Sequence, residues 1–312
     1  MLIDWHAHVI PPEAAAAPVW RGNCPMAIDR FMEAHRAANI DVSVVTETGR
    51  GIKSGSIALV QQWSDYAARL QADYPGILYG FASVDPCGGK PHLQELERAI
   101  TQLGLKGVLI LSSHNDRYPD EDDAMPFWEM VQALDIPVMI HPSVADGEGN
   151  FKGYRLANSI GRPFDTALAI ARLIVRGVLE RYPDLKIVGA HLGGGICEVI
   201  GRMDYAYELR DPAHDFMGPY TPVHIPHPPS HYLKKLYLDT VSYHSPAIRC
   251  AIDTIGVDRV LLGSDAPPLA TLKPRAIALI DELNLAPDDK AKVLGRTAAA
   301  LLKIAPAAGS RR

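Results

Sequence analysis

Several features that would point to a secreted, membrane-bound or nucleic-acid-binding protein are missing or scarce in this sequence. The chain has only 4 cysteines in 312 residues and no CxxC pair, which argues against a thiolate zinc site or a disulfide framework. No apolar run approaches the roughly 18–20 residues that span a membrane, and the first residues lack the basic start and apolar stretch of a signal peptide. We therefore expect reduced thiols in a cytoplasmic protein without a membrane partner.

An excess of positive charge is also missing, because 31 Lys and Arg residues stand against 36 Asp and Glu residues, for a formal net charge of −5. Without a basic field the protein has little to hold a phosphate backbone or an anionic lipid surface, so we expect no nucleic acid as a partner. The hydrophobic share of 47% is ordinary for a soluble globular protein. A chain of this length can form one large α/β barrel or two smaller domains.

Short β-branched runs alternate with segments of helical period along the whole chain, which predicts repeated βα units. The expected strands are Leu2–His8, Val42–Thr46, Leu78–Ser83, Gly107–Leu111, Pro137–His141, Lys186–His191, Leu236–Asp239 and Val260–Ser264. The expected helices are Ile28–Ala38, Ile57–Asp73, Leu93–Gln102, Phe127–Leu134, Phe164–Arg181, Ile196–Arg210 and Pro246–Ile255. Eight such units favour a closed (β/α)8 TIM barrel. An open doubly wound sheet would normally carry a glycine-rich phosphate turn where this chain has Trp5-His6-Ala7-His8.

The sequence shows no composition shift or flexible linker, so we expect a single domain over residues 1–304 and a loose C-terminal tail over residues 305–312. Three connections are unusually long, namely Pro11–Met26, Pro142–Pro163 and Asp211–Ser230. Loops of this length in a compact domain commonly form lids, substrate walls or subunit contacts.

Candidate ligands collect at the expected carboxyl ends of the strands. His6 and His8 close the first strand, His141 ends the fifth, His191 ends the sixth, and Asp265 follows the eighth. In a barrel these ends open on one face, which holds the active site. The i, i+2 spacing of His6 and His8 turns both imidazoles to one side of a strand, where they can chelate one cation.

Imidazole nitrogens combined with a carboxylate oxygen suit Zn²⁺ best and also admit Mn²⁺, Fe²⁺ or Co²⁺. Taken alone, each of these side chains is explained equally well as an ordinary packed or surface residue that binds no metal. Five titratable groups at the ends of four strands in apolar surroundings are instead costly to bury without a partner. The sequence therefore predicts one divalent transition metal ion per chain, with zinc first among the candidates.

At these residues the chain resembles the amidohydrolase superfamily, and within it the branch named for aminocarboxymuconate-semialdehyde decarboxylase. The resemblance rests on the HxH pair, Met139-Ile-His141-Pro142, the His191-Leu-Gly-Gly-Gly195 run that ends in Gly201-Arg202, and Leu262-Gly-Ser-Asp265. It implies a (β/α)8 barrel in which one metal ion, commonly zinc or manganese, is held by His6, His8, His141 and Asp265. It also implies that His191 stands beside the metal as the catalytic base, and Asp265 is the second candidate for proton transfer.

The chain departs from the family pattern at Leu192 and at Ala266, where the family often has a glycine and a tyrosine. The alanine at position 266 removes a bulky aromatic side chain near the metal, which affects the expected substrate more than metal binding. In the decarboxylase a substrate-binding arginine follows strand one, and Arg21 is the candidate for its replacement here.

Two further residues are candidates for contact with the substrate or, for the first of them, with a metal ligand. They are His114 after the fourth strand and Arg50 after the second. A capped loop histidine and a rim salt bridge with Glu47 are the respective alternatives.

The predicted ligands serve two reactions equally well. The first is decarboxylation of a small unsaturated or aromatic carboxylate, with a base assisting protonation of the carbon that loses carbon dioxide. The second is hydrolysis of a lactone, an amide or a carbon–carbon bond in a catabolic acid by a metal-activated water. We expect the decarboxylase and keep the hydrolase as the alternative, with a barrel that has lost catalysis as a third interpretation. The expected partner is a small-molecule carboxylate substrate, and a homodimer is a further expectation.

Overall fold

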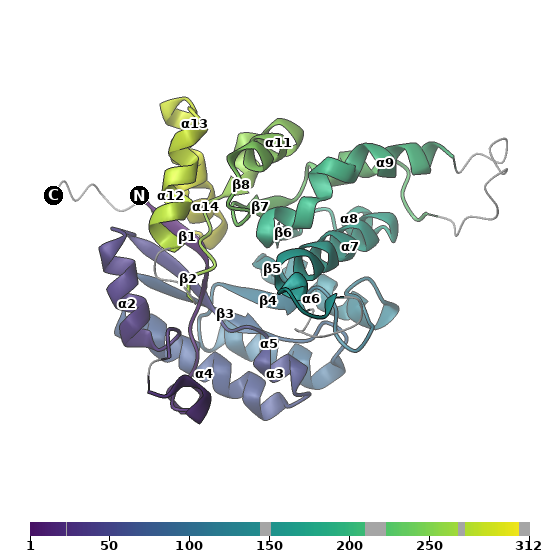
Figure 1. Ribbon diagram of the computed structural model, residues 1–312. Coiled ribbons are helices and arrows are strands. Elements are labelled where there is room, and N and C mark those ends of the chain that lie inside the picture. The colour runs from purple at the N-terminus through teal and green to yellow at the C-terminus, as the bar shows by residue number, and fades with distance from the viewer. Residues whose placement is uncertain (23, 144–150, 210–222, 268–271, 306–312) are drawn as a thin grey trace.

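The computed structural model describes every residue except 23, 144–150, 210–222, 268–271 and 306–312 (Figure 1). Parallel strands form one sheet in chain order, namely β1 (Ile3–His8), β2 (Val42–Thr46), β3 (Leu78–Ser83), β4 (Gly107–Leu111), β5 (Pro137–His141), β6 (Lys186–Gly189), β7 (Tyr237–Asp239) and β8 (Val260–Leu261). Backbone hydrogen bonds from Trp5 N to Leu262 O and from His8 N to Ala266 O, both 2.8 Å long, join β1 to the segment that directly follows β8. The sheet is thus closed into the predicted (β/α)8 barrel.

Helices connect the strands and cover the outside of the barrel. They are α1 (Pro12–Ala15), α2 (Ile28–Ala37), α3 (Arg50–Lys53), α4 (Ile57–Asp73), α5 (Gly89–Thr101), α6 (Met125–Leu134), α7 (Arg162–Val175), α8 (Val178–Arg181), α9 (Ile196–Glu208), α10 (Pro229–Leu233), α11 (Ser245–Ile255), α12 (Leu272–Glu282), α13 (Pro287–Ala291) and α14 (Thr297–Leu302). In Figure 1, α9 projects from the barrel beside α7. None of the helices in the described ranges is long and apolar enough to cross a membrane.

Side chains alternate along the strands between two apolar clusters. One set packs inside the barrel and includes Ile3, Trp5, Phe81, Met139 and Leu261. The rings of Trp5 and Phe81 meet edge to face there, with their centroids 5.4 Å apart. The other set faces the helices. Because both clusters are buried, the strands are apolar on both sides, as parallel strands under a helical layer must be.

A β-bulge interrupts β1 between Asp4 and Ala7. Trp5 belongs to the inner cluster, and the adjacent His6 also points inward, toward the other site histidines. A bulge re-aims side chains in this way, because it places one extra residue on a strand. Strict alternation along β1 would have sent these two neighbours to opposite sides, so the sequence did not predict the bulge.

Two expected strands end earlier in the structure. β6 ends at Gly189 and β8 at Leu261, so His191 and Asp265 lie in the connections that follow them. The expectation that His191 ends the sixth strand is therefore wrong. His191 and Asp265 have φ angles of +54° and +55°, which a strand does not allow.

The helix expected over Phe164–Arg181 is two helices, α7 and α8. Gly177 separates them with a φ of +74°, and a Cβ at this position would lie 2.4 Å from the carbonyl oxygen of His224. Of the three long connections, Pro11–Met26 contains α1 and a 3-10 turn. Residues 144–150 of the second, most of the third and the tail from residue 306 lie outside the described residues.

Candidate metal centre

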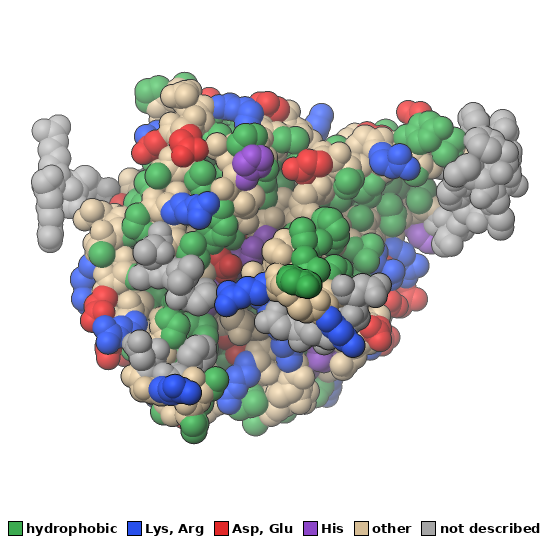
Figure 2. Space-filling model, in the orientation of Figure 1, with side chains coloured by type: hydrophobic (Ala, Val, Ile, Leu, Met, Phe, Trp, Pro, Cys, Tyr) green, Lys and Arg blue, Asp and Glu red, His purple; other side chains and the backbone are tan. Residues whose placement is uncertain are grey.

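The four side chains that the family resemblance assigns to the metal meet at the carboxyl end of the barrel. His6 and His8 come from β1, His141 ends β5, and Asp265 follows β8, and their ligand atoms all lie within 4.8 Å of one another. His6 is 0% exposed and His141 is 7% exposed, whereas the Asp265 side chain is 26% exposed. The group is therefore most accessible at Asp265. Figure 2 shows histidine and acidic side chains inside a hollow near the middle of this face.

Hydrogen bonds leave the Nε2 atom of each imidazole free to bind a cation. His6 Nδ1 donates to Asp239 Oδ2 (2.6 Å), and His141 Nδ1 donates to the carbonyl of the following proline (3.1 Å). His8 Nδ1 lies 2.9 Å from the hydroxyl oxygen of Thr46, which in turn donates to a backbone carbonyl (3.2 Å). With Nδ1 of each ring bonded in this way, Nε2 is the nitrogen that can bind a cation once it carries no proton. Histidine ligands of metals characteristically use their second nitrogen in this way.

The spacing of the free donor atoms also fits one cation. His6 Nε2 and His8 Nε2 lie 3.2 Å apart, and Asp265 Oδ1 lies 3.3 Å and 3.2 Å from them. Two lone pairs at this distance repel one another, so either a proton on His6 Nε2 or a bound cation is needed between these atoms. Zn–N bonds of about 2.0–2.1 Å at near-tetrahedral angles place two nitrogens roughly 3.3 Å apart. The donor set therefore fits a small divalent cation.

The electrostatics of the group favour a bound positive charge. Burial disfavours the charged form of His6, but the carboxylates of Asp265 and Asp239 outweigh it and raise the pKa of His6 to about 10. Burial lowers the pKa of His8, and burial with the neighbouring imidazoles lowers the pKa of His141 well below its usual value. Burial opposes ionisation of Asp265, yet the surrounding imidazoles hold its pKa well below the ordinary range. Without a metal, the site thus combines an ionised Asp265 with a protonated His6 and with neutral His8 and His141, and a bound cation would replace the proton on His6 Nε2.

His191 stands beside this group and partly in the open mouth. Its Nε2 lies 3.3 Å from Asp265 Oδ2, and its ring centroid is 5.1 Å from that of His6. The side chain is 16% exposed, and among the described residues Nδ1 has no hydrogen-bond partner. This position suits an imidazole that exchanges protons with a ligand in the mouth, and that role stays a prediction.

The backbone around His191 is held in an unusual conformation. His191, Leu192 and the three glycines that follow have φ angles between 54° and 88°. A Cβ on Gly194 would lie 1.7 Å from the carbonyl oxygen of Pro163, so glycine is required where this turn presses on α7. Asp239 Oδ1 accepts a hydrogen bond from Leu192 N (3.1 Å). These contacts stabilise a left-handed backbone that costs about 1–3 kcal/mol per non-glycine residue.

Two carboxylates near the site were missed by the sequence analysis. Asp239 ends β7 and bonds both to His6 and to the turn after His191, while Asp4 on β1 is equally buried. The sequence did contain a signal for them, because a carboxylate inside or at the end of a buried apolar strand needs a partner.

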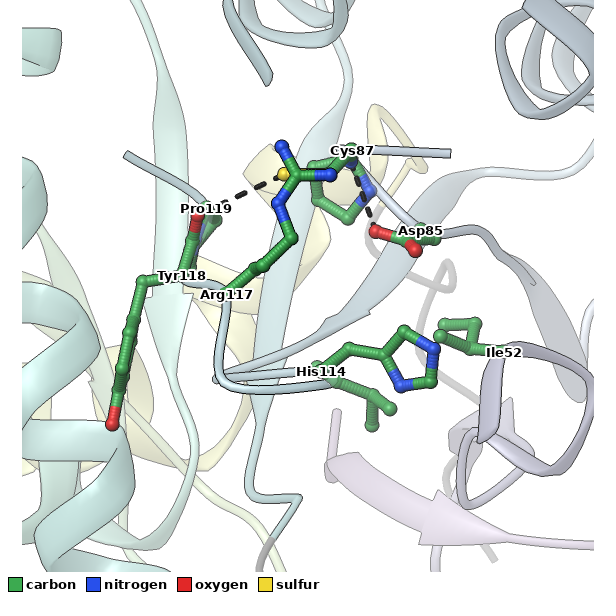
Figure 3. Close-up of a pocket in the computed structure, with 9 residues that line it drawn as sticks. Ile52, Asp85, Cys87, His114, Arg117, Tyr118 and Pro119 are labelled. Carbon is green, nitrogen blue, oxygen red and sulfur yellow. Dashed lines mark hydrogen bonds between the residues drawn. The ribbon is translucent and has the colours of Figure 1, made fainter. Parts of the chain in front are cut away.

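His114 is not one of the clustered side chains of the metal group. It lines a small cavity with Arg117 and Cys87 at the carboxyl ends of β3 and β4 (Figure 3). The four cysteines are free thiols, as expected, and burial raises the pKa of Cys87 to about 11 and that of Cys197 to about 12. Neither thiol is a nucleophile near neutral pH.

The two arginine candidates are exposed. Arg21 ends a 3-10 turn, and Arg50 begins α3. Glu47 is buried and accepts a hydrogen bond from Gly51 N (3.2 Å), so it fixes the turn that carries Arg50. Within the described ranges, neither arginine is hydrogen-bonded to the metal group, nor is His114, so their substrate contacts stay predictions.

A barrel with imidazoles and a carboxylate gathered at its mouth is typical of metal-dependent TIM-barrel proteins. A family model described as Amidohydrolase matches residues 3–304, and the chain belongs to this family. A 2-amino-3-carboxymuconate-6-semialdehyde decarboxylase from Dictyostelium discoideum is 30% identical over 253 residues, which cover 80% of this chain and 68% of that protein. These matches confirm the resemblance to the branch named for that decarboxylase.

Solved structures confirm the fold. A 5-carboxyvanillate decarboxylase from Sphingomonas paucimobilis has a TM-score of 0.84 at 24% identity, covering 97% of this chain and 99% of that chain. A dihydroxybenzoic acid decarboxylase from Polaromonas sp., with bound manganese and the inhibitor 2-nitroresorcinol, has a TM-score of 0.79 at 23% identity, covering 97% of this chain and 96% of that chain.

Proposed function

We propose that the protein is a metal-dependent decarboxylase that removes carbon dioxide from a small aromatic or unsaturated carboxylate. The observation that carries the proposal is the partly exposed pair of His191 and Asp265, which stands over three buried imidazoles. In this arrangement, side chains that can transfer a proton lie next to the proposed cation site, and both are accessible from the opening of the barrel. The relative and the two solved structures named above are decarboxylases, which supports the same reaction here.

The proposed ligands of a single divalent transition metal ion are His6, His8, His141 and Asp265. When bound, such an ion would fix substrate oxygen atoms and withdraw electron density from them. The donor set makes zinc the first candidate. Manganese is the second candidate, because the Polaromonas enzyme binds it, and iron and cobalt also suit these donors. Elemental analysis of the purified protein tests this, and about one ion per chain is expected.

His191 and Asp265 supply the proton that decarboxylation requires. In this reaction the bond between a substrate carbon and its carboxylate breaks, and that carbon receives a proton in place of carbon dioxide. His191 Nε2 and Asp265 Oδ2 are 3.3 Å apart and partly exposed, so they can share a proton and deliver it to a substrate in the mouth. Asp239 holds the turn after His191 in position during this transfer.

The test separates decarboxylation from hydrolysis. Protein loaded with zinc or with manganese is incubated separately with hydroxybenzoates such as 5-carboxyvanillate and 2,6-dihydroxybenzoate and with lactones or amides of small catabolic acids, and carbon dioxide release is measured. In deuterium oxide, a decarboxylated product gains one deuterium at the carbon that lost its carboxylate. In water labelled with oxygen-18, a hydrolysed product gains the heavy oxygen instead. Incorporation of oxygen-18 without release of carbon dioxide would replace this proposal with the hydrolase.

A homodimer is proposed from the surface of α7 and α9. Apolar side chains exposed on these helices and just before α7 are Ile160, Phe164, Leu168, Val199 and Tyr205, and Phe164 is 60% exposed. A monomer rarely leaves a large apolar patch in water. Light scattering should give the mass of a dimer, and the double variant Phe164→Glu, Leu168→Glu should give the mass of a monomer. The free thiols support the cytoplasm as the proposed location. We also propose that residues 1–304 form one domain.

A further inference from the structure

A buried ion pair adjoins β1 and the segment that follows β8, which together carry three of the four proposed ligands. Asp4 on β1 is 0% exposed and Lys273 on α12 is 1% exposed, and the Lys273 ammonium bonds to Asp4 Oδ2. We propose that Asp4, neutralised by Lys273, is a positioning residue of the metal centre that holds His6 and Asp265 at their mutual spacing. This inference rests on the metal site of the proposed function and not on the reaction.

The Asp4 carboxylate bonds directly to the two segments that carry these ligands. Oδ1 accepts from Ser264 N (2.9 Å) and lies 3.3 Å from His6 N, and Oδ2 accepts from the Ser264 hydroxyl (2.5 Å). Ser264 immediately precedes Asp265. One carboxylate thus connects the ligand on β1 with the ligand after β8.

Both segments have a backbone that needs such contacts. The bulge in β1 locally disrupts the ladder of strand hydrogen bonds, and Asp265 has a left-handed φ of +55°. Asp265 N donates to His6 O (2.8 Å), and Ala266 N donates to the Ser264 hydroxyl oxygen (3.2 Å). With the bonds of Asp4, these contacts form a closed network around Asp265.

The pair lies away from the mouth. Lys273 Nζ is 4.6 Å from the ring centroid of Phe31 on α2, and Phe31 belongs to the apolar cluster between the strands and the helices. Asp4 and Lys273 are therefore sealed behind the strands and cannot touch a substrate. Any effect they have on the site must act through His6 and Asp265.

The test compares metal affinity with stability. Asp4→Asn should weaken binding of Zn²⁺ about 10–100-fold in competition with a chelator, because an amide offers only one acceptor to the Ser264 and His6 donors. Asp4→Asn also leaves a buried ammonium unpaired, so the unfolding temperature of the metal-free protein should fall. The double variant Asp4→Asn, Lys273→Met should recover most of that stability but not the metal affinity, because the contacts to Ser264 stay weakened.

Glu95→Gln is the matched control. It alters another buried carboxylate, which pairs with Arg98 (2.8 Å) on α5, and should lower the unfolding temperature without changing metal affinity. If Asp4→Asn behaves like Glu95→Gln, the pair only stabilises the fold and the inference is rejected. If Asp4→Asn does not fold, Ser264→Ala decides: a several-fold loss of metal affinity supports the inference, and unchanged affinity rejects it. A wild-type protein that binds metal without decarboxylating would contradict only the proposed reaction, whereas one that binds no metal rejects both.

Discussion

His6 and His191 differ in how their second ring nitrogen is bonded. His6 Nδ1 donates to Asp239, which fixes the ring and its tautomer, whereas His191 Nδ1 has no acceptor within the described residues. A fixed tautomer suits a metal ligand, because its lone pair must always point to the cation. An unfixed tautomer suits an acid or a base, because the ring must gain and lose a proton in turn.

Replacing His191 by asparagine should therefore separate catalysis from metal binding. We expect the turnover number of His191→Asn to fall by roughly a hundredfold or more, the usual scale of a lost general base, while metal content stays at the wild-type level. Both quantities are measured on one preparation, with His114→Asn as a control that leaves metal content unchanged. A parallel loss of metal would make His191 a ligand, and wild-type turnover would leave Asp265 as the candidate base.

Asp239→Asn should act on His6, one of the proposed metal ligands. Asp239 Oδ1 accepts from Leu192 N and Val241 N, so an asparagine oxygen there would turn the amide NH2 toward His6 Nδ1. The imidazole would then have to protonate Nε2, which removes the lone pair that binds the cation. We expect a 10–100-fold loss of metal affinity by titration calorimetry. The exposed Asp253→Asn on α11 is the control, and equal affinities in the two variants would contradict the role of Asp239.

His35 should make stability depend on pH. Burial and the charge of Lys273 lower the pKa of His35 to about 4, whereas the pKa in the unfolded chain is about 6.5. Between these values the unfolded chain holds a proton that the folded chain lacks, so the free energy of unfolding falls as pH falls through this window. Urea denaturation at pH 7 and pH 5 should show a loss about 1–2 kcal/mol larger in the wild type than in His35→Gln. Equal losses would show that His35 does not cause the effect.

At the scale of elements, the sequence predicted structure well where local pattern decides it. The bounds of β2 to β5 are as predicted, because each strand is a short, mostly apolar run that differs in pattern from the helical segments around it. The predicted bounds were wrong at His191 and Gly177, where packing against distant segments sets a left-handed backbone. The site histidines were predicted because their spacing is visible along the chain. Asp239 was not, because its partner His6 lies 233 residues away.

The turn between β6 and α9 should tolerate no side chain at Gly194. Gly194→Ala places a methyl group against the Pro163 carbonyl and adds left-handed strain, so we expect a loss of about 3 kcal/mol or more in the free energy of unfolding. Gly104 has a similar φ of +71° but no atom within 4 Å of a new Cβ, so Gly104→Ala should cost only about 1 kcal/mol. Denaturant titration of both variants measures the difference. Equal losses would mean that φ, and not the contact with α7, restricts this position.

For the whole molecule, a metal held by residues from β1, β5 and the end of β8 would cross-link distant parts of the barrel. Because such a cation would bind only the folded chain, a concentration 1,000 times its dissociation constant would add about 4 kcal/mol of stability. We expect chelation to lower the unfolding temperature by roughly 5–10 °C, as measured by calorimetry. His6→Ala should unfold at a lower temperature and show no further shift on chelation. An unchanged temperature in the wild type would argue against the metal centre.

The apolar cluster inside the barrel closes the proposed active site at its inner end. Ile3, Trp5, Phe81 and Met139 close the space beneath the metal group, so a ligand bound there has no passage through the barrel. Substrate, carbon dioxide and the decarboxylated product would all have to use the opening at the carboxyl ends of the strands. The product and carbon dioxide would thus have to leave the site before the next substrate molecule can bind there.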